Sequence, residues 1–260
     1  MNVFKIRCSS IGHIMTNAKG AITENQLNEI DELSNKEKIT EKQQEKLNSL
    51  IYKRDNPELS DTAKTYCKSW LKSQLYDRRI EFTSKYTDKG LIMEDESIDF
   101  VAEQLKLGML FKDDKYLEDD FMTGHMDISL PDEVHDIKNS WSWETFPLLE
   151  TEIPNHLYYW QLQGYMSLAN KHKAKLIYVL SDTPQHLIER EARNYCFYNG
   201  YGDLDMEIYN EFHKKLTYQD VDPKFKIKIF EIERNDSDIQ KIKDRVIECR
   251  NYIEMLNTLI

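Results

Sequence analysis

The sequence predicts an α/β fold in one domain, with a helical arm near the N-terminus. Strand-like stretches, either alternating or continuously apolar, occur at 121–140, 174–181 and 225–232. Helical stretches separate or follow them, at 90–107, 154–169, 203–216 and 238–256. Neither an internal repeat nor a low-complexity linker divides the 260 residues, so we expect one domain over 1–260.

The first 80 residues predict mostly helix. An extended segment at the N-terminus leads into a helix that we expect to be capped by Ser9 or Ser10. The region 23–55 predicts two amphipathic helices broken near residue 34, which we interpret as an appended arm or insertion. Ser60 is expected to cap the next helix, whose lysines lie at i,i+4 spacing on one exposed stripe: Lys64, Lys68 and Lys72. That stripe is either a solvated face or a track for a DNA backbone.

Composition limits the functional classes. The net charge of -11 argues against a generic basic nucleic-acid coat, although binding needs only a local basic patch. The four cysteines stand far apart without a CxxC pair, so a zinc or iron–sulfur site is not expected. The sequence lacks an apolar run of membrane-helix length and a signal-peptide core, so we expect a cytoplasmic protein that does not contact a membrane.

The stretch 121–140 contains the strongest candidate site. It predicts two strands joined by a turn at 131–133, and pairing them brings Asp127, Asp136 and Lys138 onto one wall. Two carboxylates and an amine on a half-buried sheet are costly to desolvate unless they bind a cation or each other.

Two further polar residues occupy apolar registers of predicted helices. Glu94 completes the stripe formed by Leu91, Ile98, Ala102 and Leu105, and Gln161 lies in the inner stripe of the helix at 154–169. A buried polar group needs a partner. We expect Gly164 to let that second helix approach the sheet closely.

These residue types suit metal-assisted phosphodiester hydrolysis. Mg²⁺ prefers oxygen ligands and keeps several waters, and Asp127, Asp136 and the Ile137 carbonyl would supply the protein share. Lys138 would stabilise charge on the phosphate, and Gln161 would orient a water or Lys138. Glu94 would ligate a second cation or hold a water. The alternative is a buried ion-pair network without catalysis.

The order Gly90-x-x-x-Glu94, Asp127, Asp136-x-Lys138, Gln161-x-x-x-Tyr165 resembles the PD-(D/E)xK nuclease superfamily, and within it the phage lambda-type alkaline exonucleases and their RecB-like relatives. The similarity covers about 89–183, the expected catalytic core. It implies a restriction-endonuclease-like core, a central mixed β-sheet flanked by helices. It also implies that Glu94, Asp127 and Asp136 form the acidic metal site, that Lys138 is the catalytic lysine, and that Gln161 is the family's helix glutamine.

The same resemblance implies DNA-binding roles for Arg7, Ser9, Ser10 and Tyr165, with one of the serines meeting a DNA 5′ phosphate. Two positions depart from the family pattern. Asp136 stands where lambda-type enzymes usually have Glu, and Met126 stands where they have Pro.

The function implied is a Mg²⁺-dependent deoxyribonuclease, with Mn²⁺ able to substitute. We expect a phage-type 5′→3′ exonuclease in the host cytoplasm that resects double-stranded DNA ends during recombination. A homotrimer and a single-strand annealing protein are implied partners. A structure-specific endonuclease of the same fold, or a catalytically silent DNA-binding module, are the alternatives.

Overall fold

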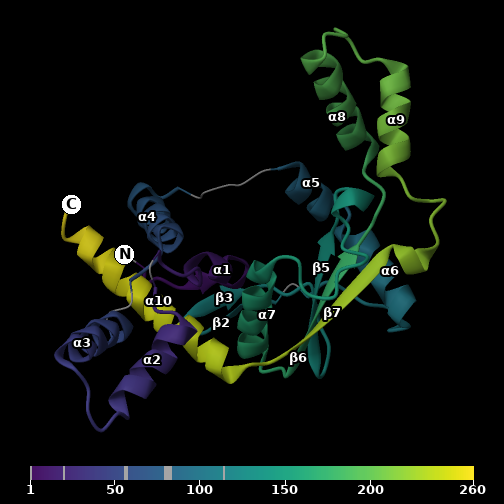
Figure 1. Cartoon of the computed structure of the whole chain (residues 1–260). Helices are drawn as coiled ribbons and strands as arrows, with labels where there is room; N and C mark the ends of the chain where they lie inside the picture. Colours follow the sequence, from purple (N-terminus) through teal and green to yellow (C-terminus); the bar gives the residue numbers. More distant parts are fainter. Residues whose placement is uncertain (1, 20, 56–57, 79–83, 114) are drawn as a thin grey trace. The chain divides into compact units, whose positions relative to one another are not determined.

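The computed structural model describes residues 2–19, 21–55, 58–78, 84–113 and 115–260. They divide into two compact units. The first comprises Met1–Phe4, His13–Arg78 and Ile242–Ile260, and the second comprises Lys5–Gly12 and Arg79–Lys241. The predicted α/β class is confirmed, and all the strands described lie in the second unit (Figure 1).

The first unit is helical. It contains α2 (Glu24–Ser34), α3 (Glu41–Asp55), α4 (Asp61–Tyr76) and most of α10 (Asp236–Asn257). The predicted pair of helices in the region 23–55 packs through its apolar stripes, which bury Ile30, Leu33, Leu47 and Leu50. The Ser60 side chain accepts a hydrogen bond from the Ala63 N–H and so caps α4 as predicted.

The second unit contains two sheets. The smaller has the order β1 (Ile6–Arg7), β3 (Met122–Gly124), β2 (Leu117–Glu118). The larger has the order β4 (Ile128–Ser129), β5 (Glu133–Asn139), β6 (Lys173–Val179), β7 (Ile227–Glu233). It is mixed as predicted, because β5 and β6 are parallel whereas the other two pairs are antiparallel. The first predicted strand of 121–140 is interrupted, since β3 and β4 belong to different sheets.

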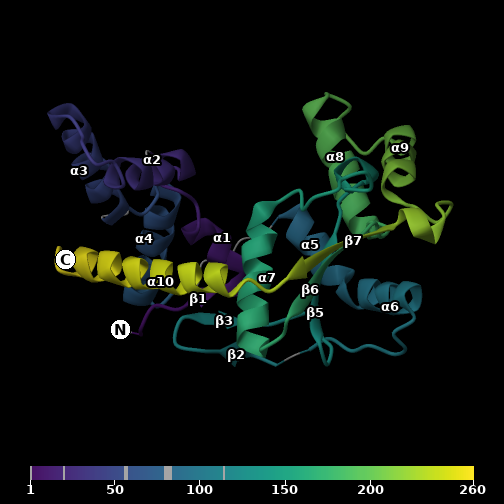
Figure 2. The same cartoon turned by 60° about the horizontal axis from the view of Figure 1, so that its bottom comes forward.

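Helices cover both faces of the larger sheet. Figures 1 and 2 show α7 (His156–Ala169) on one face and α6 (Glu94–Leu105) on the other. Val101 of α6 packs against Ile177 and Val179, with Ile137 beside them. Because strand side chains alternate between faces, Asp136 and Lys138 lie on the α7 face.

The predicted helix at 90–107 is two helices, α5 (Lys85–Ile92) and α6, which meet at Met93. The prediction of one continuous apolar stripe over 90–107 was therefore wrong. Ile98 and Ala102 are buried, but Leu91 lies on α5 and is 72% exposed.

The predicted capping by Ser9 or Ser10 is also wrong. Both residues lie inside a 3-10 turn, η1 (Cys8–Ser10), that runs directly into α1 (Ile11–Ile14). A Cβ added at Gly164 would lie 2.5 Å from Ile11 Cδ1 and 2.9 Å from Cys8 Sγ. Gly164 therefore lets this N-terminal turn, and not the sheet, approach α7.

A helical hairpin follows β6. It consists of α8 (Gln185–Tyr198) and α9 (Met206–Leu216), and it projects from the sheet in both views (Figures 1 and 2). Its base is anchored by buried Leu187, Ile188 and Leu216 against Trp141, which precedes the short turn η2 (Trp143–Thr145). A second short turn, η3 (Pro223–Phe225), leads into β7. In the described parts of the chain, every helix is too short or too polar to cross a bilayer.

Candidate active site

The two central aspartates lie side by side where the short strand β4 begins alongside β5. Strand β4 pairs with β5 so that Ile128 lies opposite His135, which places Asp127 beside Asp136. The Ile137 N–H donates a hydrogen bond of 2.7 Å to Asp127 Oδ2. Lys138 Nζ lies 2.7 Å from Asp136 Oδ2. The structure thus brings the three residues together as predicted, while their catalytic roles stay predictions.

Helix α7 fixes Asp136 from above the sheet. Asn155 caps this helix, and Gln161 projects from it toward β5, 4% exposed. Gln161 Nε2 donates to Asp136 Oδ1 at 2.9 Å and to the Tyr165 hydroxyl at 3.0 Å. Gln161 therefore orients a carboxylate, where the sequence predicted a water or Lys138. Tyr165 is 6% exposed, so its observed role is to support Gln161 rather than to present a surface to DNA.

The positive charge near Asp127 and Asp136 does not balance the negative charge of their carboxyl groups. Burial and the neighbouring Asp136 carboxylate raise the pKa of Asp127 to about 7. Burial by itself would lower the pKa of Lys138, but the charges of Asp136 and Asp127 outweigh burial and raise it. Lys138 therefore stays protonated, but its single charge does not bring the pKa of Asp127 back to its ordinary range.

This environment fits a hard cation. Asp136 Oδ2 is buried, and the Lys138 ammonium is 2.7 Å from it. The N–H and C=O of one strand residue point to the same side, so the Ile137 carbonyl also faces Asp127. Among the described residues, no three His, Cys, Asp or Glu side chains are grouped to hold a metal ion. Two carboxylates, one carbonyl and waters are nevertheless a set that Mg²⁺ accepts.

Glu94 lies differently from the prediction. It is the first residue of α6 and is 24% exposed, and its Oε2 accepts a hydrogen bond of 2.8 Å from Lys112 Nζ. Its charge contributes to the raised pKa of Asp127, so Glu94 lies within electrostatic reach of the pair. The next residue after Lys112 is also tied to the site, because the Asp113 N–H donates to the Asp127 carbonyl at 2.9 Å. Lys112 was not among the predicted site residues, because no helical or strand register marks it.

Tyr158 is a second residue of the site that was not predicted. Its ring centre lies 4.9 Å from Lys138 Nζ, a cation–π contact that fixes the amine from the α7 side. The sequence spacing could have indicated Tyr158, because it lies three residues from Gln161 on one helix and shares its face.

The predicted DNA-binding residues of the N-terminus lie along η1. Arg7 is exposed and pairs with Thr123 across the β1–β3 ladder, and Ser9 is exposed whereas Ser10 is half-buried. The turn packs on α7 at Gly164, so the same helix supports Ser9, Ser10 and Asp136.

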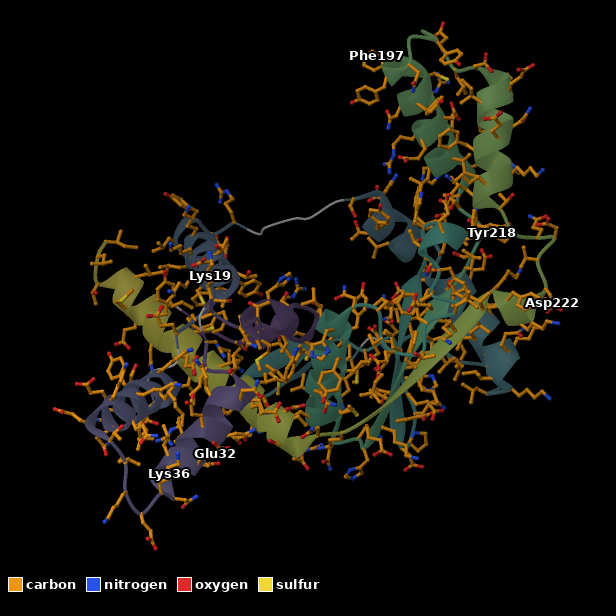
Figure 3. The ribbon with its side chains drawn as sticks, in the orientation of Figure 1. Lys19, Glu32, Lys36, Phe197, Tyr218 and Asp222 are labelled. Atoms are coloured by element: carbon orange, nitrogen blue, oxygen red, sulfur yellow. The ribbon has the colours of Figure 1, made fainter. Side chains whose placement is uncertain are left out.

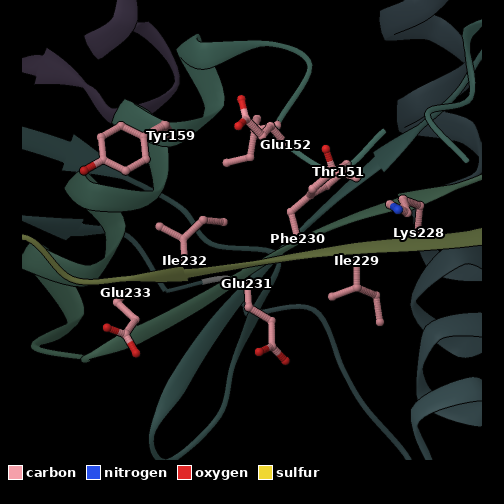
Figure 4. Close-up of a pocket in the computed structure, with 10 residues that line it drawn as sticks. Thr151, Glu152, Tyr159, Lys228, Ile229, Phe230, Glu231, Ile232 and Glu233 are labelled. Atoms are coloured by element: carbon pink, nitrogen blue, oxygen red, sulfur yellow. The ribbon is translucent and has the colours of Figure 1, made fainter. Parts of the chain in front are cut away.

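A separate hollow of about 450 Å³ lies beside β7. Figure 4 shows Tyr159, Ile232 and Phe230 on one side of the strand and Glu231 and Glu233 on the other. It contains none of the predicted site residues, and its charged groups are mostly acidic. This hollow is therefore not the candidate active site.

Comparison with solved structures identifies the fold. A phage-related exonuclease from Haemophilus somnus is similar to the chain at a TM-score of 0.71 and 24% identity, over 99% of this chain and 96% of that one. An alkaline exonuclease from Laribacter hongkongensis has a TM-score of 0.57 and 12% identity, over 98% and 92%.

The chain has the alkaline exonuclease fold.

The Laribacter enzyme in complex with dAMP gives a TM-score of 0.58 over the same shares of both chains. No protein-family model matches the sequence, and no curated protein is significantly similar to it. The resemblance predicted from the motif set is confirmed at the level of the alkaline exonuclease fold.

Proposed function

We propose that this protein is a Mg²⁺-dependent deoxyribonuclease that degrades double-stranded DNA from its ends in the 5′→3′ direction. The observation that carries the proposal is the convergence of Asp127, Asp136 and Lys138 at one sheet edge. It occurs in a chain whose neighbours of the same fold are exonucleases.

Asp127, Asp136 and the Ile137 carbonyl would hold the cation, with Mn²⁺ able to replace Mg²⁺. When bound, the cation supplies the positive charge that activates a water and stabilises the phosphoryl group. Glu94 becomes available to a second cation or a water once its ion pair with Lys112 opens.

Side chains of the protein position the acidic ligand and stabilise the charge on the phosphate. Gln161 fixes the Asp136 carboxylate by donating to Oδ1, and Oδ2 faces Lys138. Lys138 presents a protonated amine, held by Tyr158, where negative charge grows on the phosphate during in-line attack. Hydrolysis in this arrangement leaves the phosphate on the 5′ side of the released nucleotide.

The wider biological setting is part of the proposal. We propose that the protein acts in phage-type recombination in the host cytoplasm, beside a single-strand annealing protein and as a homotrimer. A ring would reconcile the net charge of -11 with DNA binding, because a basic bore can coexist with an acidic exterior.

One assay tests the activity. Linear duplex labelled at its ends, with either 5′-phosphate or 5′-hydroxyl, is incubated with the protein and Mg²⁺, beside a covalently closed circle and an EDTA control. We expect nucleotides from linear DNA, faster from 5′-phosphate ends, and an intact circle. Cutting of the circle would instead identify an endonuclease. DNA binding without any product in Mg²⁺ or Mn²⁺ would identify a catalytically silent module.

A further inference from the structure

Strand β7 is the last strand of the larger sheet, and within the described residues no strand pairs with its outer side. The Leu180 N–H donates to the Lys226 carbonyl, so the even-numbered residues of this stretch bond toward β6. Backbone groups of an antiparallel pair alternate between facing the partner strand and facing away from it. Ile229 and Glu231 therefore direct their N–H and C=O groups outward, where the described residues offer them no hydrogen bond.

The C-terminal end of the same edge is closed by a side chain. Gln163 of α7 donates to the Glu233 carbonyl at 2.8 Å and accepts a hydrogen bond of 2.9 Å from the Asn235 N–H. This one amide takes the place that a peptide group of a further strand would occupy. The protein thus satisfies the end of the edge with a residue of its own, whereas the centre of β7 lacks such a partner.

The open centre of β7 borders the hollow of about 450 Å³ (Figure 4). Phe230 and Ile232, each 6% exposed, line the hollow from the strand, and Tyr159 lines it from α7. The loop residues 151–153 complete the lining. A strand added beside β7 would direct every second side chain to this apolar side.

The opposite face of β7 is acidic at its outer row. Glu231 and Glu233 are both exposed there, and among the described residues neither carboxylate forms an ion pair. Across the ladder they lie opposite Lys175 and Lys173 of β6, but Lys175 is paired with Glu133. Opposite charges on directly neighbouring strands stabilise a sheet. An added strand with basic side chains on this face would therefore be favoured.

The exposed apolar tip of the α8–α9 hairpin lacks this combination. Phe197 is 73% exposed there (Figure 3), but it lies in α8, whose backbone groups bond within the helix. An exposed ring without unsatisfied backbone groups or a matching row of charge does not specify a partner.

We propose that β7 binds an extended, basic segment of a partner protein as an added strand, with apolar side chains over Phe230 and lysine or arginine beside Glu231 and Glu233. A second copy of β7 fits less well, because the same face of that strand carries Ile227, Ile229 and the two glutamates, and no base. Phosphate of a nucleic acid would meet the same carboxylates. The surface shares no residue with the candidate active site, so this proposal goes beyond the proposed function and does not depend on it.

The test uses two fluorescein-labelled peptides of about nine residues, enough to span the seven residues of β7. One alternates valine with lysine, and the other alternates valine with glutamate. Fluorescence anisotropy gives the Kd of each for the full chain, for Glu231→Lys and for the matched control Glu211→Lys, an exposed glutamate of α9. The lysine peptide is also made with N-methyl groups either on its valines or on its lysines. Thermal unfolding checks the fold of each variant.

We expect the lysine peptide to bind at least about 10-fold more tightly than the glutamate peptide. Glu231→Lys should weaken its binding roughly 5- to 30-fold, and Glu211→Lys should match the wild type. Only one of the two methylated sets should prevent binding, because alternate N–H groups of a strand point to opposite edges. Methylated lysines prevent it if the added strand is antiparallel to β7, and methylated valines if it is parallel. Bound peptide should slow hydrogen exchange at the Ile229 and Glu231 amides.

Equal weakening by Glu231→Lys and Glu211→Lys would overturn the proposal, since the peptide would then follow only the net charge. Equal effects of the two methylated sets would overturn it as well, because no backbone pairing would be involved. A dimer of the free wild-type chain that Glu231→Lys dissociates would assign the edge to a second copy instead. If Glu231→Lys does not fold, the methylated peptides and the exchange rates of the wild type decide. Each of these results leaves the proposed nuclease activity unchanged.

Discussion

Two lysines of the second unit show how differently a buried amine can be used. Lys138 lies beside Asp136 and Asp127, and their charges raise its pKa. Lys89 of α5 is fully buried, and its Nζ donates to the carbonyl oxygens of Ser140, Trp141 and Ser181 at 2.7–3.2 Å. Burial lowers the pKa of Lys89 to about 8, and the charge of Asp182 opposes this only in part.

The difference lies in the partners. Lys138 is one amine beside two carboxyl groups, so negative charge there remains available to a ligand. Lys89 faces backbone carbonyls, which its three protons satisfy at the ends of β5 and β6. We infer that Lys138 takes part in the reaction and that Lys89 stabilises the fold.

The largest expected effect separates the two roles directly. Lys138→Met should reduce cleavage of linear duplex by at least about 100-fold, because the charge that stabilises the phosphate is lost. The variant should remain folded, because the Asp127 carboxyl, whose pKa is about 7, takes up a proton when the neighbouring amine is lost. Full cleavage by Lys138→Met, measured as acid-soluble nucleotide, would remove the catalytic role.

Lys89→Met should show the opposite pattern. Three buried carbonyls would lose their donor, so the free energy of unfolding should fall by about 3 kcal/mol. Cleavage per folded molecule should persist. Lys224→Met, at a side chain that is 67% exposed, is the control for removing a charge. Denaturant unfolding measures the difference in stability. An unfolding midpoint of Lys89→Met equal to that of Lys224→Met would contradict the role of Lys89 in stabilising the fold.

The pH dependence of stability should sharpen the same contrast. The folded pKa of Lys89, about 8, lies below its ordinary value of 10.5, so the unfolded chain holds this proton more tightly. The buried ammonium therefore costs stability below pH 8, and the cost disappears as pH rises from 8 to 10.5. The wild type should gain at most about 3 kcal/mol relative to Lys89→Met across this window. A gap that shrinks with rising pH would contradict the assignment.

A smaller loss of cleavage is expected for substitutions of Gln161 and Tyr165, which position Asp136. Gln161→Leu keeps the volume of the side chain but removes the donor to Asp136 Oδ1, so cleavage should fall by about 10-fold. Tyr165→Phe removes only the acceptor that steadies Gln161, and should cost a few-fold at most. Steady-state kinetics on linear duplex distinguish the two, and a larger loss in Tyr165→Phe would place that hydroxyl closer to the chemistry.

The sequence predicted the parts of this site that depend on local periodicity. Period two placed Asp127, Asp136 and Lys138 on one wall, and helical spacing placed Gln161 against the sheet. It failed where contacts join distant segments. The break at Met93 freed Glu94 from the predicted stripe. The partner of Glu94, Lys112, comes from an irregular segment 18 residues away.

Lys89 and Gly164 illustrate the same limit. A lysine in a helical stretch gives no sign that three carbonyls at strand ends will surround it. A helical glycine signals a close approach, but the approaching group, the turn at Cys8, is more than 150 residues earlier. Tertiary contacts decide both cases, and neither local propensity nor spacing encodes them.

The most direct test of the central claim measures cation binding without any reaction. Mn²⁺ is titrated by calorimetry, in the absence of DNA, into the wild type, Asp136→Asn and Glu133→Gln. Glu133 is the matched control, because it is an acid of the same strand that is already paired with Lys175. We predict that the wild type and Glu133→Gln bind Mn²⁺ alike, and that Asp136→Asn binds at least about 10-fold more weakly. Equal binding by all three proteins, or no binding by the wild type, would contradict the account.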